Sequence, residues 1–293
     1  MLNLASWYYR NLLGDNELIE TPDNYQIKLI NGRDVFESNV SLKNKFRPSW
    51  LSKSALYKDC DGSGTSEFQN IAVYKAISEA LERMAFYEFI DSRANEFAFD
   101  LNPTTTGMAS FPHFFKMYAR INAKKEAIER WAIHEFNRSR LPIKEHHNNI
   151  ENLIHYEISV PFKQFRVSLL KLKTAFGYVY GFACGDNLKE SYSRAIVELD
   201  RNKRVLTKMK GIDSLPETLS SLDKTFLFFS SNDGEDYFNN LIINSPKAFL
   251  VSNPKIVCDK ELKGKWSEYT VVWRFLFEDS YYDNGDDYKF FMF

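Results

Sequence analysis

The sequence predicts an α+β protein in which mostly antiparallel sheets pack with helices. Three long stretches repeat apolar residues at helical spacing, and short runs rich in Val, Ile, Phe and Tyr have the composition of strands. Runs that follow one another so closely are expected to pair antiparallel. No stretch rich in Gly, Ser and Pro divides the chain, so residues 1–293 are expected to form a single domain.

A hairpin and a helix are predicted in the first third of the chain. Residues 25–40 alternate apolar and polar side chains around an Asn-Gly dipeptide, which favours tight hairpin turns. Residues 66–90 have helical spacing after a Gly-Ser-Gly, and Thr65 and Ser66 are able to cap this helix.

A second helix is predicted over roughly residues 112–136, after a loop at residues 100–112. Pro112 suits its first turn, because a helix leaves the N–H groups of that turn unpaired. The apolar side of this helix is expected to consist of Met117, Ile121, Ile128 and Ile133.

Strands and a third long helix are predicted in the second half of the chain. The helix covers residues 186–209, with an Asp-Asn pair to cap its start and basic residues near its end. A short helix is expected near residues 236–243. The predicted strands are residues 154–160, 165–174, 177–185, 224–230, 247–253 and 268–278.

Composition excludes several classes of function. With 38 Lys and Arg against 39 Asp and Glu, the net charge of -1 gives no global positive field for nucleic acid or a membrane surface. No apolar run approaches the ~18 residues of a membrane span. Three widely spaced cysteines, Cys60, Cys184 and Cys258, fit a reduced, cytoplasmic protein without a zinc motif.

The frame Ala, Glu, Ala, aliphatic, Glu, Arg occurs twice, within AISEALER at residues 76–83 and AKKEAIER at residues 123–130. Residues three apart share one face of a helix, so each motif presents a pair of carboxylates. Surface glutamates beside basic neighbours are the commoner explanation of such a pair. Flanking alanines and aliphatic residues favour a packed face instead. The pairs are Glu79 with Glu82 and Glu126 with Glu129.

If the two helices face each other, four carboxylates converge and require cations. Oxygen ligands suit Mg²⁺, which characteristically takes one or two carboxylates together with substrate phosphates, so a magnesium nucleotide is the implied ligand. Gly-containing segments before both helices could also favour an anion. A di-iron bundle would need Glu-x-x-His, and the chain lacks this motif and a Walker P-loop.

The third helix offers a further acid beside several arginines. Glu198 lies near Arg194, Arg201 and Arg204 at helical spacings. An amphipathic helix with a basic outer face explains these residues equally well.

These blocks resemble the YcaO family, ATP-dependent enzymes that activate backbone amides of peptides. The match covers residues 62–202: a Gly-rich segment and a helix ending in Glu-x-x-Glu-Arg, then a Gly-Met-Ala segment before a second such helix, then a last helix with a further Glu. The resemblance implies ATP and Mg²⁺ as cofactors. It also implies a ribosomally made precursor peptide as substrate and a separate protein that binds the leader peptide.

The resemblance also implies roles for individual residues. The implied metal ligands are Glu79, Glu82, Glu126 and Glu129. The implied nucleotide-side residues are Arg83, Arg130, Arg194, Glu198 and Arg201. The implied chemistry is phosphorylation of a peptide carbonyl oxygen after a nucleophile adds to its carbon, leaving an azoline, a thioamide or an amidine.

Departures from the family pattern keep a second hypothesis open. Only 47 residues separate Glu82 from Glu129, Ser63 stands where the family often has Lys, Arg201 stands where many members have Gln, and a proline-rich tail is absent. The alternative is a catalytically degenerate binding or scaffold partner in a peptide-modifying complex. Residues 39–58, which are basic and free of acids, could reach a phosphate or an acidic peptide, or form a solvated loop.

Overall fold

The computed structural model describes residues 4–14, 16–48, 60–209, 219–278 and 289–291. The chain divides into two compact units that interleave along the sequence. The first contains residues 1–51, 59–127 and 255–282, and the second residues 52–58, 128–254 and 283–293. The helix α3 (Lys116–Asn137) begins in the first unit and ends in the second. The prediction of a single domain stays a prediction.

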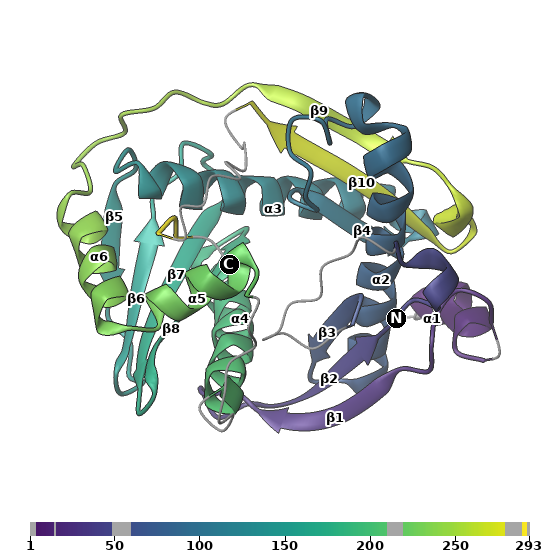
Figure 1. The fold of residues 1–293 in the computed structure, drawn as a ribbon, viewed down its shortest axis with the longest axis horizontal. Helices are drawn as coiled ribbons and strands as arrows, with labels where there is room; N and C mark the ends of the chain where they lie inside the picture. The colour runs from purple at the N-terminus through teal and green to yellow at the C-terminus, as the bar shows by residue number, and fades with distance from the viewer. Residues whose placement is uncertain (1–3, 15, 49–59, 210–218, 279–288, 292–293) are drawn as a thin grey trace. The chain divides into compact units, whose positions relative to one another are not determined.

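The first unit contains two antiparallel three-stranded sheets, ordered β1-β2-β3 and β4-β10-β9 (Figure 1). Its long helix α2 packs against β2 and β3. Among the described residues its main elements are α1 (Leu4–Tyr9), β1 (Asp23–Lys28), β2 (Asp34–Val40), β3 (Gly62–Ser66), α2 (Gln69–Ser92), β4 (Met108–Pro112), β9 (Ile256–Leu262) and β10 (Thr270–Phe277).

The predicted hairpin is confirmed. Strands β1 and β2 pair antiparallel from Asp23 with Asn39 to Lys28 with Asp34. Gly32 closes the turn with φ at 83° and donates its N–H to the carbonyl oxygen of Leu29 at 2.8 Å. Glycine suits this position because it has no Cβ to oppose a positive φ.

The Gly-containing segment before α2 is a strand, β3. Helix α2 begins at Gln69, and its N-cap residue Phe68 provides no side-chain cap, so the predicted capping by Thr65 and Ser66 is wrong. Glycine serves close packing here. A Cβ at Gly62 would lie 2.1 Å from the carbonyl oxygen of Ala76 in α2, so the strand approaches the helix through its bare backbone.

The beginning of α3 also differs from the prediction. Pro112 ends strand β4, and a short 3-10 turn separates it from α3, so the proline is not in the first turn of the helix. Ile128 and Ile133 are buried as predicted, whereas Met117 and Ile121 are 60% and 38% exposed. Before Ile128, α3 instead buries small side chains, those of Ala119, Ala123 and Ala127.

The second unit contains one antiparallel sheet ordered β5-β6-β7-β8, with α4 packed on β7 and β8 (Figure 1). Three of these strands and α4 match the predicted elements, and Asn187 caps α4 by accepting the N–H of Glu190 at 3.0 Å. The main elements are β5 (Ile143–His146), β6 (Leu153–Ile158), β7 (Arg166–Thr174), β8 (Gly177–Gly185), α4 (Leu188–Met209), α5 (Ser221–Phe229) and α6 (Asn232–Ile243).

Two predicted strands of this unit are wrong. Residues 224–230 lie largely in helix α5, which a capping box between Ser220 and Asp223 opens and which buries Phe226 and Phe229 three residues apart. Residues 247–253 form no strand. The short helix predicted near residues 236–243 is confirmed as α6, and the strand predicted at residues 268–278 is confirmed as β10.

Each unit has its own apolar core. In the first, one face of α2 packs with Tyr9, Phe97, Trp266 and Val272. In the second, Phe291 lies among aromatic rings, with its centroid 5.0 Å from that of Tyr180. None of the helices in the described ranges combines the length and apolar character that crossing a bilayer demands.

Replacing Gly62 by alanine is expected to destabilise the protein by at least about 2 kcal/mol, because the added Cβ collides with backbone that cannot move aside. Urea unfolding measures the change. Gly14→Ala is the control, since nothing lies within 4 Å of a Cβ placed there. Equal stability of the two variants would contradict the close packing of β3 on α2.

Replacing Phe291 by alanine is expected to cost about 3 to 5 kcal/mol, because the ring is fully buried and its removal leaves a cavity. The control is Phe249→Ala in the same unit, since Phe249 is 45% exposed. Thermal melting of both variants tests this. A loss at Phe291 no larger than at Phe249 would show that the ring is not part of the core.

Candidate functional site

The first motif places two carboxylates on one face of α2. Glu79 and Glu82 are three residues apart on this helix and both are half-buried. Strand β3 orients Glu79, because the backbone N–H of Ser63 donates to Glu79 Oε2 at 3.1 Å. The close contact of β3 with α2 is therefore what brings this donor to the carboxylate.

Glu82 and Glu126 influence each other electrostatically within the first unit. The pKa of Glu82 lies well above its ordinary value, first because the carboxyl is buried and second because the charge of Glu126 opposes ionisation. Arg83 partly offsets this effect, and Glu79 adds to it. Three acids of the two motifs thus share one environment, and a bound cation would relieve their repulsion.

Arg83 lies beside these acids and is held by a neutral partner. Its guanidinium is 4.0 Å from Glu79 Oε1 and donates from Nη1 to the hydroxyl of Thr105 at 2.9 Å. Burial opposes the charged form of Arg83, yet Glu79 and Glu82 raise its pKa. The guanidinium therefore stays charged without a close ion pair to Glu79.

The second unit contains Glu129 and the other predicted nucleotide-side residues, Arg130, Arg194, Glu198 and Arg201. Glu129 is 8% exposed, and its Oε2 accepts the backbone N–H of Cys184 in β8 at 2.9 Å. Burial raises the pKa of Glu129, whereas Arg130, Arg194 and the Cys184 N–H lower it, and Glu198 raises it again. Glu129 is thus a buried acid with cations nearby.

The arginines of this unit have defined partners. Arg130 lies over the ring of Phe182, with its guanidinium carbon 5.3 Å from the centroid. Glu198 forms an ion pair with Arg201 at 3.0 Å. The other pairs on α4 are Arg194 with Glu190 at 4.0 Å and Arg204 with Asp200 at 3.1 Å.

The structure thus groups the predicted residues in two sets, one in each unit. Convergence of all four glutamates involves both units and stays a prediction. Within the described ranges, no group of three or more His, Cys, Asp or Glu side chains is arranged to hold a metal ion. The first set is Glu79, Glu82, Arg83 and Glu126, and the second is Glu129, Arg130, Arg194, Glu198 and Arg201.

Sequence reasoning missed the groups that orient the acids. Ser63 and Cys184 act through backbone N–H groups, which carry no residue-specific signal, and Thr105 lies 22 residues from Arg83. The two Gly-containing segments expected to be anion-binding loops contain strands β3 and β4.

Ion pairs account for part of the basic stretch at residues 39–58. Lys45 pairs with Glu17 at 2.9 Å and Arg47 with the buried Asp61 at 3.2 Å. Lys53 and Lys58 lie outside the described residues. His146 is in β5 and contacts Glu157 at 2.8 Å.

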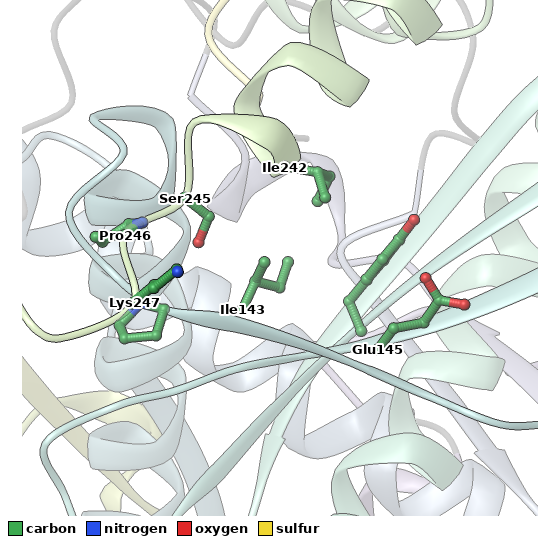
Figure 2. A pocket seen from close by; sticks show the side chains of 8 residues that line it. Ile143, Glu145, Ile242, Ser245, Pro246 and Lys247 are labelled. Atoms are coloured by element: carbon green, nitrogen blue, oxygen red, sulfur yellow. The ribbon is translucent and has the colours of Figure 1, made fainter.

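A pocket of about 420 Å³ lies in the second unit, apart from the predicted site residues. Figure 2 shows Ile143 and Glu145 on β5, with Ile242 at the end of α6 and Lys247 beyond it. Glu145 and Lys247 are both exposed, so the pocket is a surface hollow with a mixed lining. None of the predicted glutamates and arginines lines it.

In the protein without ligand, Glu82 is expected to contribute a loss of stability as pH rises. The raised pKa of Glu82 means that the folded state holds a proton which the unfolded chain releases, so the loss begins above the ordinary glutamate pKa. Glu82→Gln should reduce this loss between pH 5 and pH 7, measured by urea unfolding. Glu88→Gln, at an exposed position of α2, should retain the wild-type pH dependence. If the free energy of unfolding depended on pH in the same way in both variants, the raised pKa of Glu82 would be contradicted.

Among solved structures, that of YcaO from Methanopyrus kandleri bound with AMPPCP and Mg²⁺ is similar to this chain. The TM-score is 0.56, with 14% sequence identity over 93% of this chain and 88% of that chain. No protein-family model matches the chain, and no curated protein does. The likeness extends over nearly the whole chain, and the α+β class with antiparallel sheets agrees with it. The chain has a YcaO-like fold.

Proposed function

We propose that this chain is a YcaO-like enzyme that uses Mg-ATP to activate a backbone amide of a ribosomally synthesised peptide. The observation that carries the proposal is the shared environment of Glu82, Glu126 and Glu79 beside Arg83. Carboxylates that oppose one another's ionisation repel unless a cation neutralises them. A structure of the same fold was determined with an ATP analogue and Mg²⁺, which supports a magnesium nucleotide as the ligand.

In the proposed site, the glutamates of the two sets bind magnesium and the arginines bind phosphate. In the first unit, Glu79, Glu82 and Glu126 are the proposed magnesium ligands, and in the second unit Glu129 is. Their oxygens are hard ligands of the kind that Mg²⁺ prefers. The arginines suit phosphate, because a guanidinium keeps its charge and matches the geometry of phosphate oxygens. The proposed nucleotide-side residues are Arg83, Arg130, Arg194, Glu198 and Arg201.

Bound Mg-ATP would supply the phosphoryl group. In the proposed reaction a nucleophile adds to the amide carbon, and the carbonyl oxygen is then phosphorylated. Loss of phosphate leaves an azoline, a thioamide or an amidine, according to the nucleophile. The arginines would stabilise charge on the transferring phosphoryl group. The substrate is a precursor peptide, and a separate partner protein is proposed to bind its leader segment.

A second candidate function is a YcaO-like scaffold that has lost catalysis. The short separation of the two motifs favours it, because Glu129 is only 47 positions after Glu82 in the sequence. Ser63 is the second observation, since a serine provides no cation toward a phosphate. Such a protein would bind the peptide or a partner enzyme without nucleotide turnover.

The wild-type protein is expected to bind ATP only together with a divalent metal, because carboxylates without a cation repel a triphosphate. Calorimetry with ATP plus Mg²⁺, compared with ATP plus a chelator, measures this. Equal affinity under both conditions would argue against the proposed magnesium ligands. No binding at millimolar Mg-ATP would favour the scaffold.

Glu82→Gln and Glu129→Gln are each expected to weaken Mg-ATP binding by at least about tenfold, because each removes a charge and a metal ligand together. Glu88→Gln is the matched control, since it changes an exposed glutamate of α2. The rise in melting midpoint with Mg-ATP reports affinity for the folded state. Equal shifts in the wild type and all three variants would remove these glutamates from the nucleotide site.

A further inference from the structure

Strand β10 contains a fully buried arginine that is bonded to backbone carbonyls. Arg274 is 0% exposed, and its guanidinium carbon lies 3.9 Å from the centroid of the Phe99 ring. Among the described residues no carboxylate forms an ion pair with it. Its donors reach the carbonyl oxygens of Thr104 at 2.8 Å, Asn102 at 2.7 Å and Ala98 at 3.4 Å.

A buried guanidinium is costly, so its hydrogen bonds have to compensate for lost hydration. All three acceptors belong to the segment at residues 98–107, between α2 and β4. A single side chain therefore ties this segment to β10 at three points. Arginine suits the role because its planar fork can donate in several directions at once, which a lysine ammonium on a flexible stem cannot match.

Other contacts fix the far end of the same segment to β10. The N–H of Phe275 donates to the carbonyl oxygen of Gly107 at 2.7 Å. Gly107 has φ at 70°, and a Cβ there would lie 1.9 Å from the carbonyl oxygen of Phe275. Within the segment, the Thr104 hydroxyl accepts the N–H of Thr106 at 3.1 Å. The backbone around Thr105 is therefore held on both sides.

Thr105 links this segment to the proposed site. Its hydroxyl accepts from Arg83 Nη1 at 2.9 Å, while the guanidinium stays 4.0 Å from Glu79. Without this neutral acceptor, the attraction of Glu79 and Glu82 would favour a closer ion pair and make Arg83 less available to a phosphate. The position of Thr105 thus decides which partner Arg83 has.

We infer that Arg274 is a positioning residue, which clamps residues 98–107 so that Thr105 holds Arg83 ready for a phosphate. The inference rests on the proposed function for the role of Arg83. The clamp itself is a property of the protein without ligand. It acts through the segment, since the atoms that Arg274 contacts are carbonyl oxygens and the Phe99 ring.

The first measurement is backbone amide hydrogen exchange in the protein without ligand. In Arg274→Met, amides of residues 102–107 are expected to exchange at least tenfold faster than in the wild type, while the middle of α2 changes less. Arg274→Lys should show a smaller change in the same direction and guards against a methionine variant that fails to fold. The control is Thr270→Val, which removes another buried polar group of β10, bonded to the carbonyl oxygen of Phe111. In Thr270→Val, the change in exchange rate at residues 102–107, relative to the wild type, should be no larger than the change in α2.

The second measurement is Mg-ATP affinity by calorimetry. Arg274→Lys and Thr105→Val are each expected to weaken binding severalfold, because both release Arg83 from its neutral partner. The double variant should bind Mg-ATP no more weakly than whichever single variant has the lower affinity, because both changes break the same chain of contacts. Thr270→Val should bind as the wild type does, even if it melts earlier.

The outcomes separate the inference from the proposed function. If the wild type fails to bind Mg-ATP, the proposed function and the phosphate role of Arg83 both fail, while exchange still decides on the clamp. If the wild type binds and the effects of Arg274→Lys and Thr105→Val multiply in the double variant, the inference is overturned. Exchange that accelerates equally in residues 102–107 and in α2 also overturns it, because Arg274 would then support only global stability.

Discussion

Close contact between glycine-bearing strands and alanine-bearing helices is the constraint on which both units depend. A Cβ at Gly62 in β3 would meet the backbone of Ala76 at 2.1 Å, and one at Gly181 in β8 would meet the carbonyl oxygen of Ala195 in α4 at 2.5 Å. These spacings leave no room for a side chain on the strand. The alanines of the first repeated motif therefore allow α2 to pack closely on the sheet that contains β3. This packing fixes where the glutamates of the motif lie.

This seating explains how the acids come to carry an electrostatic cost. Because α2 is packed closely on β3, the half-buried Glu82 stays near the charge of Glu126, and burial of its carboxyl together with that charge raises its pKa. In solution two mobile side chains would separate, but packed helices deform little. The repulsion between the carboxylates is therefore already present in the protein without ligand, and a bound cation would relieve it. Thr105 adds to the arrangement by holding Arg83 away from a close ion pair with Glu79.

Periodicity predicted the parts of the fold that alternate or repeat strongly, namely the hairpin, strands β6 to β8 and helix α4. It failed at residues 62–66, because Gly and Ser have poor strand propensity and only the packing on α2 makes this segment a strand. It failed at residues 224–230, because a short apolar run fits a helix or a strand equally well. The glutamates were identifiable from their spacing. Arg274 was not, since its acceptors lie 170 or more residues away in sequence.

The strands contribute to the acids through their backbone as well as by packing. Ser63 in β3 donates its N–H to Glu79 Oε2 in the first unit, and Cys184 in β8 donates its N–H to Glu129 Oε2 in the second. A backbone donor fixes a carboxylate without adding a mobile charge, and it engages one of the two oxygens. In Glu79 the other oxygen, Oε1, lies 4.0 Å from the guanidinium of Arg83. The same hydrogen bonds would persist in a scaffold that binds no nucleotide, so nucleotide affinity, rather than the integrity of the fold, distinguishes the two functions.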